Sequence, residues 1–332
     1  MDCLGTETVA LYVGGALGTA MRARADVHVD RCPACRTLIA RAARMISRDE
    51  ESATDPAAYA PVRPTAGTRL GRYVIRDVVG RGAMGVVLSA DDPVLGRAVA
   101  LKLLHHAADD ETDHAALLGE ARKLARLSDP NVVQVFDVGT WCGRLFLAME
   151  LIDGASLRRA SAEHAYTRGE RLEILIAAGR GLAAAHAVGI VHRDFKPDNV
   201  LIEGDGRGRR VLVGDFGLAL STTLDRTEES SLGDEDERIV GTPAYMAPEQ
   251  RVGGNVDARA DQFAFCVTAV EVLLGWRPQA IADQRDALRF RARARSLPRR
   301  LVRALARGLA VEPARRHRDV EALLLGLEQA AP

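Results

Sequence analysis

The sequence predicts an α+β fold, and three features of its pattern support this. Strand-like segments fill the chain from residue 73 to about 150, with one helical stretch among them. From about residue 155 onward, apolar residues recur mostly at helical spacing. The strands precede the helices instead of alternating with them, so a doubly wound parallel sheet is not expected. We therefore expect a strand-rich lobe followed by a helical lobe.

Length and composition limit the possible classes of protein. The chain has 332 residues, 47% of them hydrophobic, which is enough for a globular fold with a sizeable core. Lys+Arg and Asp+Glu number 45 each, so the charge balance gives no argument for nucleic acid or a membrane as the main partner. The longest apolar runs, 9–21 and 263–274, fall short of the ~18–20 residues that a membrane span requires.

Cysteine usage and the chain start indicate the compartment. Five cysteines are an odd number and do not suggest a disulfide framework. Asp2 and Glu7 precede the first apolar run without a positive segment, which argues against a signal peptide. A reducing cytoplasm is therefore expected.

Composition separates three regions. Residues 1–46 carry a helical pattern and three of the cysteines. Residues 47–70 are rich in Pro, Ala, Thr and charge, as a linker is. Residues 71–329 form the main domain. Its predicted strands are Tyr73–Val79, Val86–Ala90, Ala98–Leu104, Val132–Val138 and Leu145–Glu150, and its predicted helices are 111–127, 171–188, 257–274, 299–310 and 318–329.

The segment His192–Asn199, followed by Asp215-Phe216-Gly217, carries the chemistry of phosphoryl transfer. Asp194 can accept a hydroxyl proton, and Asn199 and Asp215 can both reach a magnesium ion. The chain has only three lysines beside 42 arginines. Two of them, Lys102 and Lys196, stand where a compact ammonium is preferred to a planar guanidinium.

Residues 80–87 fit the pattern G-x-G-x-x-G-x-V. Glycines allow backbone N–H groups to approach phosphate oxygens closely. A plain hairpin turn is the alternative, but the strands on both sides and the absence of a helix at the third glycine favour a nucleotide loop. Further on, Lys102 on an apolar strand needs a partner, which Glu120 on the following helix can supply. The alternative is a lysine reaching solvent from an edge strand.

Six motifs in this order resemble a protein kinase, specifically a bacterial serine/threonine kinase of the eukaryotic type. The resemblance covers residues 72–328 and includes Ala247-Pro248-Glu249 as its last motif. It implies a bilobal kinase fold with a β-rich N-lobe and a helical C-lobe. It also implies transfer of the γ-phosphoryl group of ATP to Ser or Thr of proteins, with magnesium or manganese as the metal.

The resemblance assigns a role to individual residues. Lys102, oriented by Glu120, would contact the α/β-phosphates, Asp194 would act as base or orienter, and Lys196 would neutralise the transferring phosphoryl. Asn199 and Asp215 would hold the metal. Val87, Ala100 and Leu201 would enclose adenine, Met149 would gate a back pocket, and the backbone of Glu150 and Ile152 would bond the adenine edge. The full nucleotide set is Val79, Gly80, Arg81, Gly82, Ala83, Met84, Gly85, Val86, Val87, Ala100, Lys102, Met149, Glu150, Ile152 and Leu201.

Three further roles follow from the same resemblance. Glu249 would pair with Arg316, and Asp261 would anchor the catalytic-loop backbone from a central helix. Arg193 would pair with a phosphate on the activation segment 218–246, whose candidate sites for autophosphorylation are Thr222, Thr223, Thr227, Ser230, Ser231 and Thr242. The acidic residues within 228–237 leave two alternatives: they partly satisfy Arg193, or they form a solvated loop. The arginine-rich stretch 285–307 is interpreted as one solvated helical face, with docking of an acidic substrate as the alternative.

The N-terminal motif His28-x₃-Cys32-x₂-Cys35 has metal-ligand spacing, and Cys3 could supply the fourth ligand of a tetrahedral zinc ion. It resembles the zinc-binding anti-sigma-factor domain, a small helical module. A redox-active C-x-x-C or merely buried cysteines are the alternatives. Cys142 and Cys266 are predicted to lie in the core.

Two other functions remain open at this stage. A catalytically poor kinase fold could serve as a scaffold or sensor whose zinc module recruits a regulatory protein. A small-molecule phosphotransferase is the other, although the motif at 247–249 and the long activation segment favour protein substrates.

Overall fold

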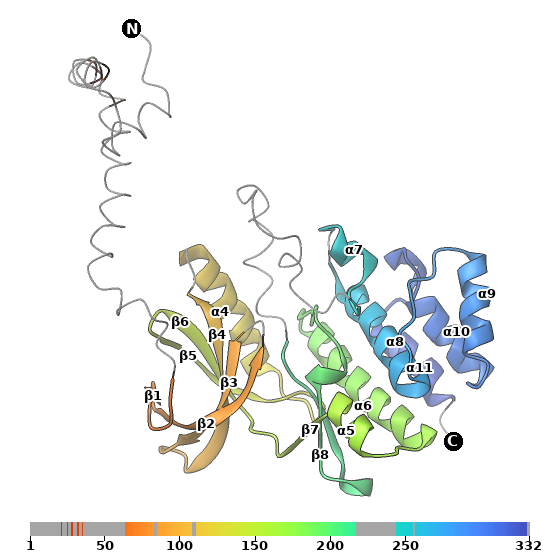
Figure 1. The fold of residues 1–332 in the computed structure, drawn as a ribbon, viewed down its shortest axis with the longest axis horizontal. Coiled ribbons are helices and arrows are strands. Elements are labelled where there is room, and N and C mark those ends of the chain that lie inside the picture. The colour runs from red at the N-terminus through yellow and green to blue at the C-terminus, as the bar shows by residue number, and fades with distance from the viewer. Residues whose placement is uncertain are drawn as a thin grey trace. The chain divides into compact units, whose positions relative to one another are not determined.

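The structure is a computed structural model that describes residues 64–330, except 83–84, 108–110, 217–243 and 255, together with Met21, Ala25, His28, Cys32 and Cys35. Side chains are described outside 105–117 and Arg207. The chain divides into two compact units, Met1–Arg63 and Pro64–Pro332. The second unit carries the two lobes (Figure 1).

The N-lobe is a six-stranded antiparallel sheet with one helix, α4 (Glu111–Arg126). The strand order is β1-β2-β3-β4-β6-β5. All hydrogen-bonded neighbours in it are antiparallel. The strands are β1 Arg69–Leu70, β2 Tyr73–Gly82, β3 Gly85–Asp92, β4 Arg97–Ala107, β5 Val135–Trp141 and β6 Arg144–Met149.

Alternation along β4 decides which side chains face the N-lobe core. Val99, Leu101 and Leu103 are fully buried in one cluster with β3 and β6. Successive side chains of a strand point to opposite faces, so Ala100 and Lys102 face the other way. Although Lys102 lies on the face of the sheet opposite the N-lobe core, it is only 6% exposed. Its ammonium group is therefore buried on that face.

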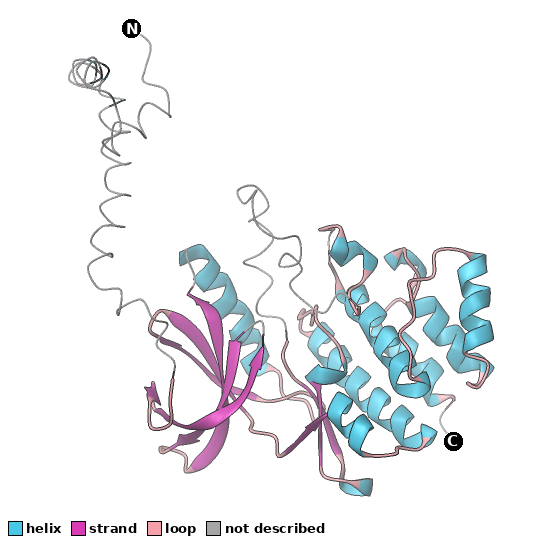
Figure 2. Ribbon diagram, in the orientation of Figure 1, coloured by secondary structure: helices cyan, strands magenta, loops and turns pink. Residues whose placement is uncertain are grey.

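The C-lobe is helical, with a small antiparallel sheet of order β7-β8-β9 beside it (Figure 2). Its strands are β7 Gly154–Ser156, β8 Val200–Glu203 and β9 Arg210–Val213. Its helices are α5 Leu157–Glu163, α6 Arg168–Ala187, α7 Pro248–Arg251, α8 Ala258–Leu274, α9 Gln284–Arg293, α10 Arg299–Gly308 and α11 Val320–Glu328, with 3₁₀ turns at Pro197–Asn199 (η1), Gly206–Gly208 and Pro313–Arg315.

Local sequence explains where the two longest helices of the C-lobe begin or end. Thr167 and Glu170 form a capping box at the start of α6, in which each side chain accepts from the other residue's backbone N–H. α8 ends at Gly275 in the left-handed region, with φ 75°. Twelve of the 17 residues of α8 are buried, so this helix is the central element of the lobe.

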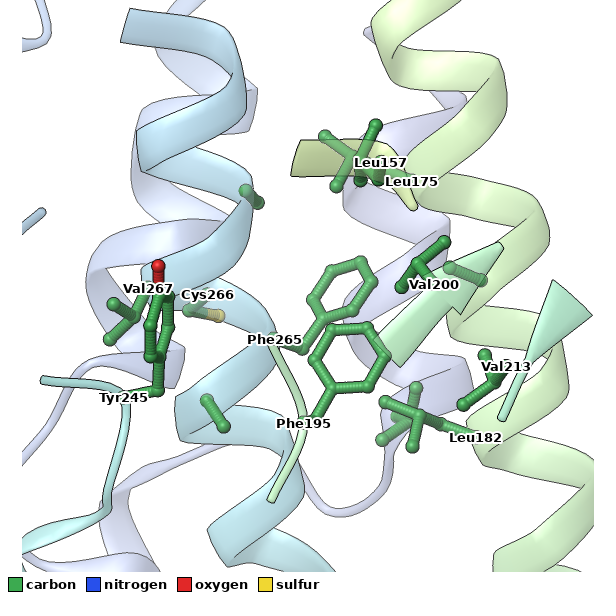
Figure 3. Packing of buried hydrophobic residues seen from close by; sticks show 14 of the residues in the cluster. Leu157, Leu175, Leu182, Phe195, Val200, Val213, Tyr245, Phe265, Cys266 and Val267 are labelled. Atoms are coloured by element: carbon green, nitrogen blue, oxygen red, sulfur yellow. The ribbon is translucent and has the colours of Figure 1, made fainter. Parts of the chain in front are cut away.

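Residues of the catalytic-loop sequence are part of the C-lobe core. The Phe195 ring lies 5.7 Å from the Phe265 ring of α8, between Leu182, Val200 and Val213 (Figure 3). This packing fixes the backbone on both sides of Asp194. The larger hydrophobic cluster also includes Leu124 of α4 and so joins the N-lobe helix to the C-lobe.

The predicted fold class is confirmed, and the differences are local. β1 pairs with β2, so Arg69 and Leu70 belong to the N-lobe sheet although the linker was expected to reach residue 70. The strand expected from Val132 begins at Val135, because Val132 forms only an isolated bridge to Val213. β1, β7, β8, β9, α5 and α7 were not predicted. The arginine-rich stretch 285–307, interpreted as one helical face, is divided between two helices, α9 and α10, with a break over 294–298. Among the described helices, none has the length and apolar character of a membrane span.

The two core cysteines that were predicted behave differently. Cys266 is fully buried in α8, as expected. Cys142 is exposed and lies in the β5–β6 turn with φ 48°, so its assignment to the core was wrong. The chain reverses at this turn between β5 and β6, so the Cys142 side chain does not enter the core.

Candidate active site

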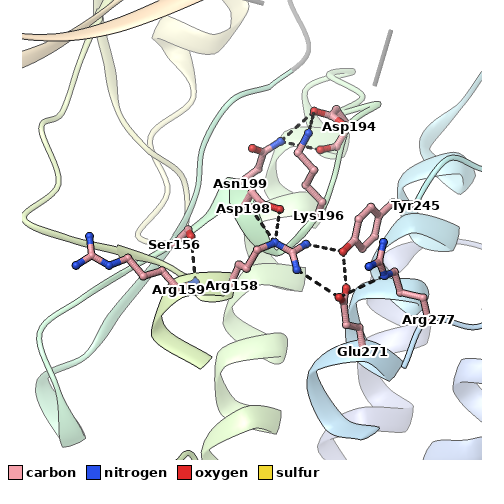
Figure 4. A network of polar contacts seen from close by, with 10 residues as sticks. All are labelled: Ser156, Arg158, Arg159, Asp194, Lys196, Asp198, Asn199, Tyr245, Glu271 and Arg277. Carbon is pink, nitrogen blue, oxygen red and sulfur yellow. Dashed lines mark hydrogen bonds and ion pairs between the residues drawn. The ribbon is translucent and has the colours of Figure 1, made fainter. Parts of the chain in front are cut away.

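Two side chains of the catalytic loop converge on Asp194. Lys196 Nζ lies 2.7 Å from Asp194 Oδ2 (Figure 4). Asn199 Nδ2 donates to the Asp194 backbone oxygen at 2.7 Å and to Oδ2 at 3.3 Å. The spacing of the motif therefore brings the candidate base, the lysine and the amide together: η1 carries Asn199, Lys196 directly precedes η1, and Asp194 stands two residues before Lys196.

Asp261 of α8 holds the backbone on the other side of Asp194. Its Oδ2 accepts from His192 N and its Oδ1 from Arg193 N, both at 2.7 Å. Asp261 is 1% exposed, so both bonds are shielded from water. The predicted anchoring of the catalytic loop by this carboxylate is present in the structure.

Arg193 has an unusual conformation and an unsatisfied side chain. Its φ of 65° lies in the left-handed region, which a non-glycine residue adopts only when its surroundings enforce it. Its Nε is buried and has no hydrogen-bond acceptor within the part of the chain that the structure describes. A buried guanidinium nitrogen without an acceptor favours binding of an anion, as the predicted phosphate contact requires.

Lys102 and Asp215 meet between the lobes. Lys102 Nζ is 3.1 Å from Asp215 Oδ1. Asp215 has φ 57°, and the next residue, Phe216, is buried with its ring 4.8 Å from the His192 ring. Burial of Phe216 therefore turns the Asp215 carboxylate toward the lysine of the N-lobe.

Glu120 does not orient Lys102 in this conformation. Within the described residues it forms no ion pair, and burial raises the pKa of its carboxyl group, although Arg193 and Lys123 act in the opposite direction. The predicted pairing of Glu120 with Lys102 therefore remains a prediction, and Lys102 pairs with Asp215 instead.

The side-chain oxygens of Asn199 and Asp215 are suitable ligands for a magnesium ion. The Asn199 amide nitrogen is held by Asp194, which leaves its carbonyl oxygen available. Asp215 Oδ1 pairs with Lys102, and its Oδ2 has no partner among the described residues. Carboxylate and amide oxygens are the ligands that Mg²⁺ prefers in proteins.

The glycine-rich loop is the tip of the β2–β3 hairpin. Gly82 pairs with Gly85 across the turn. A Cβ at Gly85 would lie 2.3 Å from the Leu103 backbone oxygen, whereas one at Gly80 or Gly82 would meet nothing within 4 Å. Packing of β3 against β4 therefore requires glycine at position 85. At Gly80 and Gly82 the space that a side chain would occupy is open. Val79 and Arg81 are exposed, Val86 is buried, and Ala83 and Met84 lie outside the described residues.

The predicted nucleotide pocket is assembled from both lobes. Val87 is paired with Lys102, and Ala100 with Met149, in the N-lobe sheet. Leu201 lies on β8 of the C-lobe and is half-buried. Lys102 and Asp215 border a mainly apolar cavity, which is also lined by Leu124, Val133, Val135, Leu147, Met149, Gly214 and Phe216. Met149 borders this cavity, and its role as the residue that gates a back pocket stays a prediction.

The segment that joins the lobes has free backbone groups for an adenine edge. Glu150 N–H donates to Gln134 O at 2.9 Å, which leaves the Glu150 carbonyl oxygen available. Outside the named helices and strands, no backbone bond of the described residues uses Ile152. The Glu150 side chain points away to Arg210, at 2.9 Å.

Glu249 and Arg316 form the predicted ion pair. The pair is bidentate, with Nη1–Oε1 at 2.6 Å and Nη2–Oε2 at 2.7 Å. The Arg316 side chain is fully buried and also donates to the Ala310, Val311 and Arg259 backbone oxygens. It therefore fixes α7 against the chain around Pro313.

The N-terminal unit brings three possible metal ligands together. His28 Nε2 lies 3.3 Å from Cys35 Sγ, and the ligand atoms of His28, Cys32 and Cys35 all lie within 4.8 Å of one another. Nitrogen and sulfur ligands of one tetrahedral zinc ion stand roughly 3.5 Å apart. The three residues therefore suit zinc. Cys3 lies outside the described residues.

A polar network next to Asp194 was not predicted. Arg158 of α5 contacts Asp198, Glu271 and Tyr245 at once (Figure 4). Asp198 and Tyr245 stand inside recognised motifs, but Arg158 and Glu271 carry no local signal. Only the folded chain brings α5 next to α8.

The comparisons with known proteins agree with this fold and site. The protein kinase domain family matches residues 73–307, and the chain belongs to this family. Pkn2 of Myxococcus xanthus, named a serine/threonine-protein kinase, is 36% identical over 230 residues, which cover 69% of this chain and 27% of that protein. RqkA of Deinococcus radiodurans, named a DNA damage-responsive serine/threonine-protein kinase, is 41% identical over 222 residues. These residues cover 64% of this chain and 31% of that protein.

A solved structure is also similar. The PknI kinase domain of Mycobacterium tuberculosis matches with a TM-score of 0.64 and 29% identity, over 80% of this chain and 99% of that one. By contrast, the chain spans about a third of the length of the curated relatives it matches.

Proposed function

We propose that this protein is a serine/threonine protein kinase that transfers the γ-phosphoryl group of ATP to protein substrates in bacterial signal transduction. The observation that carries the proposal is the convergence of Lys196 Nζ and Asn199 Nδ2 on Asp194, with Lys102 and Asp215 paired between the lobes. The names of the relatives support serine and threonine as acceptors.

Each residue contributes one part of the reaction. The substrate hydroxyl would approach Asp194, whose carboxylate orients the hydroxyl and takes its proton. The hydroxyl oxygen would bond to the γ-phosphorus as the bond between that phosphorus and the β-phosphate oxygen breaks, and ADP would leave. Lys196 would neutralise negative charge on the phosphoryl group, and Lys102 would hold the α/β-phosphates. Asn199 and Asp215 would hold magnesium or manganese, which supplies positive charge against the phosphate oxygens. Val87, Ala100, Leu201 and the backbone of Glu150 and Ile152 would hold adenine.

Catalysis is tested by incubating the wild-type protein and an Asp194→Asn variant with labelled ATP and Mg²⁺, followed by mapping of the modified residues. Label on Ser or Thr in the wild type alone is expected, because loss of a positioned proton acceptor costs about 10²–10⁴-fold. An Asp194→Asn protein that kept more than ~10% of the rate would refute the role of Asp194. An unlabelled wild type that also leaves a generic acceptor protein unmodified would favour the scaffold or sensor function.

The same mapping addresses regulation. We propose autophosphorylation within the activation segment 218–246, with Arg193 receiving the phosphate. The buried Nε of Arg193, which has no acceptor in the described part of the chain, supports this. Label confined to the linker or the N-terminal region would contradict it.

We also propose that residues 1–46 form a helical zinc module of the anti-sigma-factor type, joined by a linker to a kinase domain that ends near residue 329. The cluster of His28, Cys32 and Cys35 supports zinc, and the division of the chain at Arg63 supports a separate unit. A regulatory protein is its expected partner, and a cytoplasmic location is expected from the odd cysteine count.

The zinc module is tested by metal analysis of the purified chain. One zinc per chain is expected, with loss on Cys32→Ser or Cys35→Ser and retention in Cys142→Ser, a matched control at an exposed cysteine. Cys3→Ser shows whether Cys3 is the fourth ligand. A metal-free protein with a readily formed Cys32–Cys35 disulfide would instead support the redox alternative.

A further inference from the structure

A guanidinium outside the recognised motifs joins the catalytic loop to the C-terminal end of the activation segment 218–246. Arg158 Nε donates to both oxygens of Asp198, at 2.9 and 2.8 Å. Its Nη2 donates to the Tyr245 hydroxyl at 2.6 Å, and its Nη1 lies 3.3 Å from Glu271 Oε1 (Figure 4). One side chain of α5 therefore contacts η1, the 244–247 segment and α8.

The charges of this network are balanced. The carboxylates of Asp198 and Glu271 face the guanidinium groups of Arg158 and Arg277, and Arg277 Nε lies 3.4 Å from Glu271. The Tyr245 hydroxyl donates to Glu271 while it accepts from Arg158. Burial, followed by the hydrogen bond to Glu271, raises the pKa of Tyr245 to about 12, so the hydroxyl keeps its proton.

The place of Asp198 on η1 connects the network to Asp194. Asp198 stands between Lys196 and Asn199, the two residues whose side chains contact the Asp194 carboxylate. The turn is short, so a displacement of Asp198 moves both neighbours. At the other end, Tyr245 is 2% exposed and lies near the C-terminal end of the activation segment, in the part that the structure describes.

We propose that Arg158 is a positioning residue that sets the η1 turn, and with it Lys196 and Asn199, according to the position of the Tyr245 segment. This inference rests on the proposed kinase function. Asp198 and Tyr245 have no direct contact among the described interactions, and Arg158 bonds to both. A shift of the activation segment would therefore reach the catalytic lysine through this guanidinium.

The neighbouring residue provides a matched control. Arg159 lies on the same helix and pairs with Glu163 at 2.7 Å, and none of its interactions among the described residues reaches η1 or Tyr245. Arg158→Ala should lower kcat at least about tenfold, because small misplacements of catalytic groups have large effects on rate. The KM for ATP should change less than about threefold, since Arg158 does not border the nucleotide pocket. Arg159→Ala should leave kcat within about twofold.

Two further measurements separate positioning from a merely structural role. Arg158→Lys should restore only part of kcat, because one ammonium cannot replace a guanidinium that bonds three groups. In the protein that retains Arg158, the effects of Asp198→Asn and Tyr245→Phe on kcat should be coupled. In the Arg158→Ala background, the effects of the same two substitutions should be additive. Additivity in the Arg158 protein, or equal effects of Arg158→Ala and Arg159→Ala, would overturn the proposal.

Hydrogen exchange keeps the inference testable if the wild type has no kinase activity. Asn199 N–H donates to Lys196 O at 3.0 Å within η1. Arg158→Ala should speed exchange of this amide, and Arg159→Ala should not. Unchanged exchange in both variants would refute the positioning role, whereas an unlabelled wild type with a loosened turn in Arg158→Ala would refute only the kinase function.

Discussion

At the scale of single residues, the Glu249–Arg316 pair shows how burial decides the worth of a contact. Arg316 has a fully buried side chain, and the exposed fraction of the Glu249 side chain is 13%. Removing one partner of such a pair leaves a buried charge without compensation. Arg315, the next residue, pairs with Glu312 at 2.8 Å, but both side chains are mostly exposed.

Glu249→Gln should therefore lower the free energy of unfolding by about 3–5 kcal/mol. Glu312→Gln, which breaks the adjacent exposed pair, should cost less than about 1 kcal/mol. Denaturant unfolding of both variants measures the difference. Equal losses would show that the buried pair has no special weight.

Two histidines give stability a pH dependence. Burial lowers the pKa of His192 and of His317. Around His317, Arg307 lowers the pKa further, while the bond of its ring to Ala304 O and the charge of Asp319 raise it. The folded state thus favours the neutral rings, and unfolding takes up protons once the pH falls below the unfolded value of ~6.5.

The free energy of unfolding should consequently decline as the pH falls from about 7 toward 5. His317→Gln should remove part of this decline, whereas His164→Gln, at an exposed position, should leave it as in the wild type. Denaturant unfolding at several pH values measures the slopes. A His317→Gln slope equal to that of the wild type would contradict the assignment.

At the scale of elements, a single glycine sets the packing of α8 against α10. A Cβ at Gly308 would lie 2.3 Å from Cys266 Sγ, and Cys266 is fully buried. Gly308→Ala should cost about 1–3 kcal/mol of unfolding free energy through overpacking. Cys266→Ala should recover much of that loss in the double variant, because it vacates the volume that the new methyl needs.

Gly119 of α4 provides the opposite case. It is also helical, but a Cβ there would meet nothing within 4 Å. Gly119→Ala should therefore stabilise the protein by up to about 1 kcal/mol. If both glycine variants lost the same stability, helix packing would not explain the requirement at Gly308.

At the scale of the whole molecule, the features that could be predicted are those that depend on residues close together in sequence. The strand that carries Lys102, the central helix α8 and the close spacing of Asp194, Lys196 and Asn199 could all be predicted from the sequence. The partners of Lys102 could not, because the pairing depends on how α4 lies relative to Asp215. Arg158 was missed for the same reason, since its contacts lie 40 to 113 residues away in sequence.

The relation between the two lobes yields the last prediction. In this conformation Lys102 is paired with Asp215, and Glu120 carries a carboxyl group whose pKa is raised by burial, without an ion pair among the described residues. Glu120→Gln should therefore leave the free energy of unfolding of the nucleotide-free protein within about 1 kcal/mol of the wild type, or raise it.

Kinase activity should respond differently, because phosphate binding would draw Lys102 from Asp215 and leave Glu120 to orient it. Glu120→Gln should lower kcat at least about tenfold. Lys102→Met, the comparison variant, should both lose activity and destabilise the nucleotide-free protein, since it leaves Asp215 unpaired. A Glu120→Gln protein with wild-type activity would show that Glu120 does not orient Lys102 when the nucleotide is bound. One that lost more than about 2 kcal/mol of stability would show that the glutamate already has a partner before the nucleotide binds.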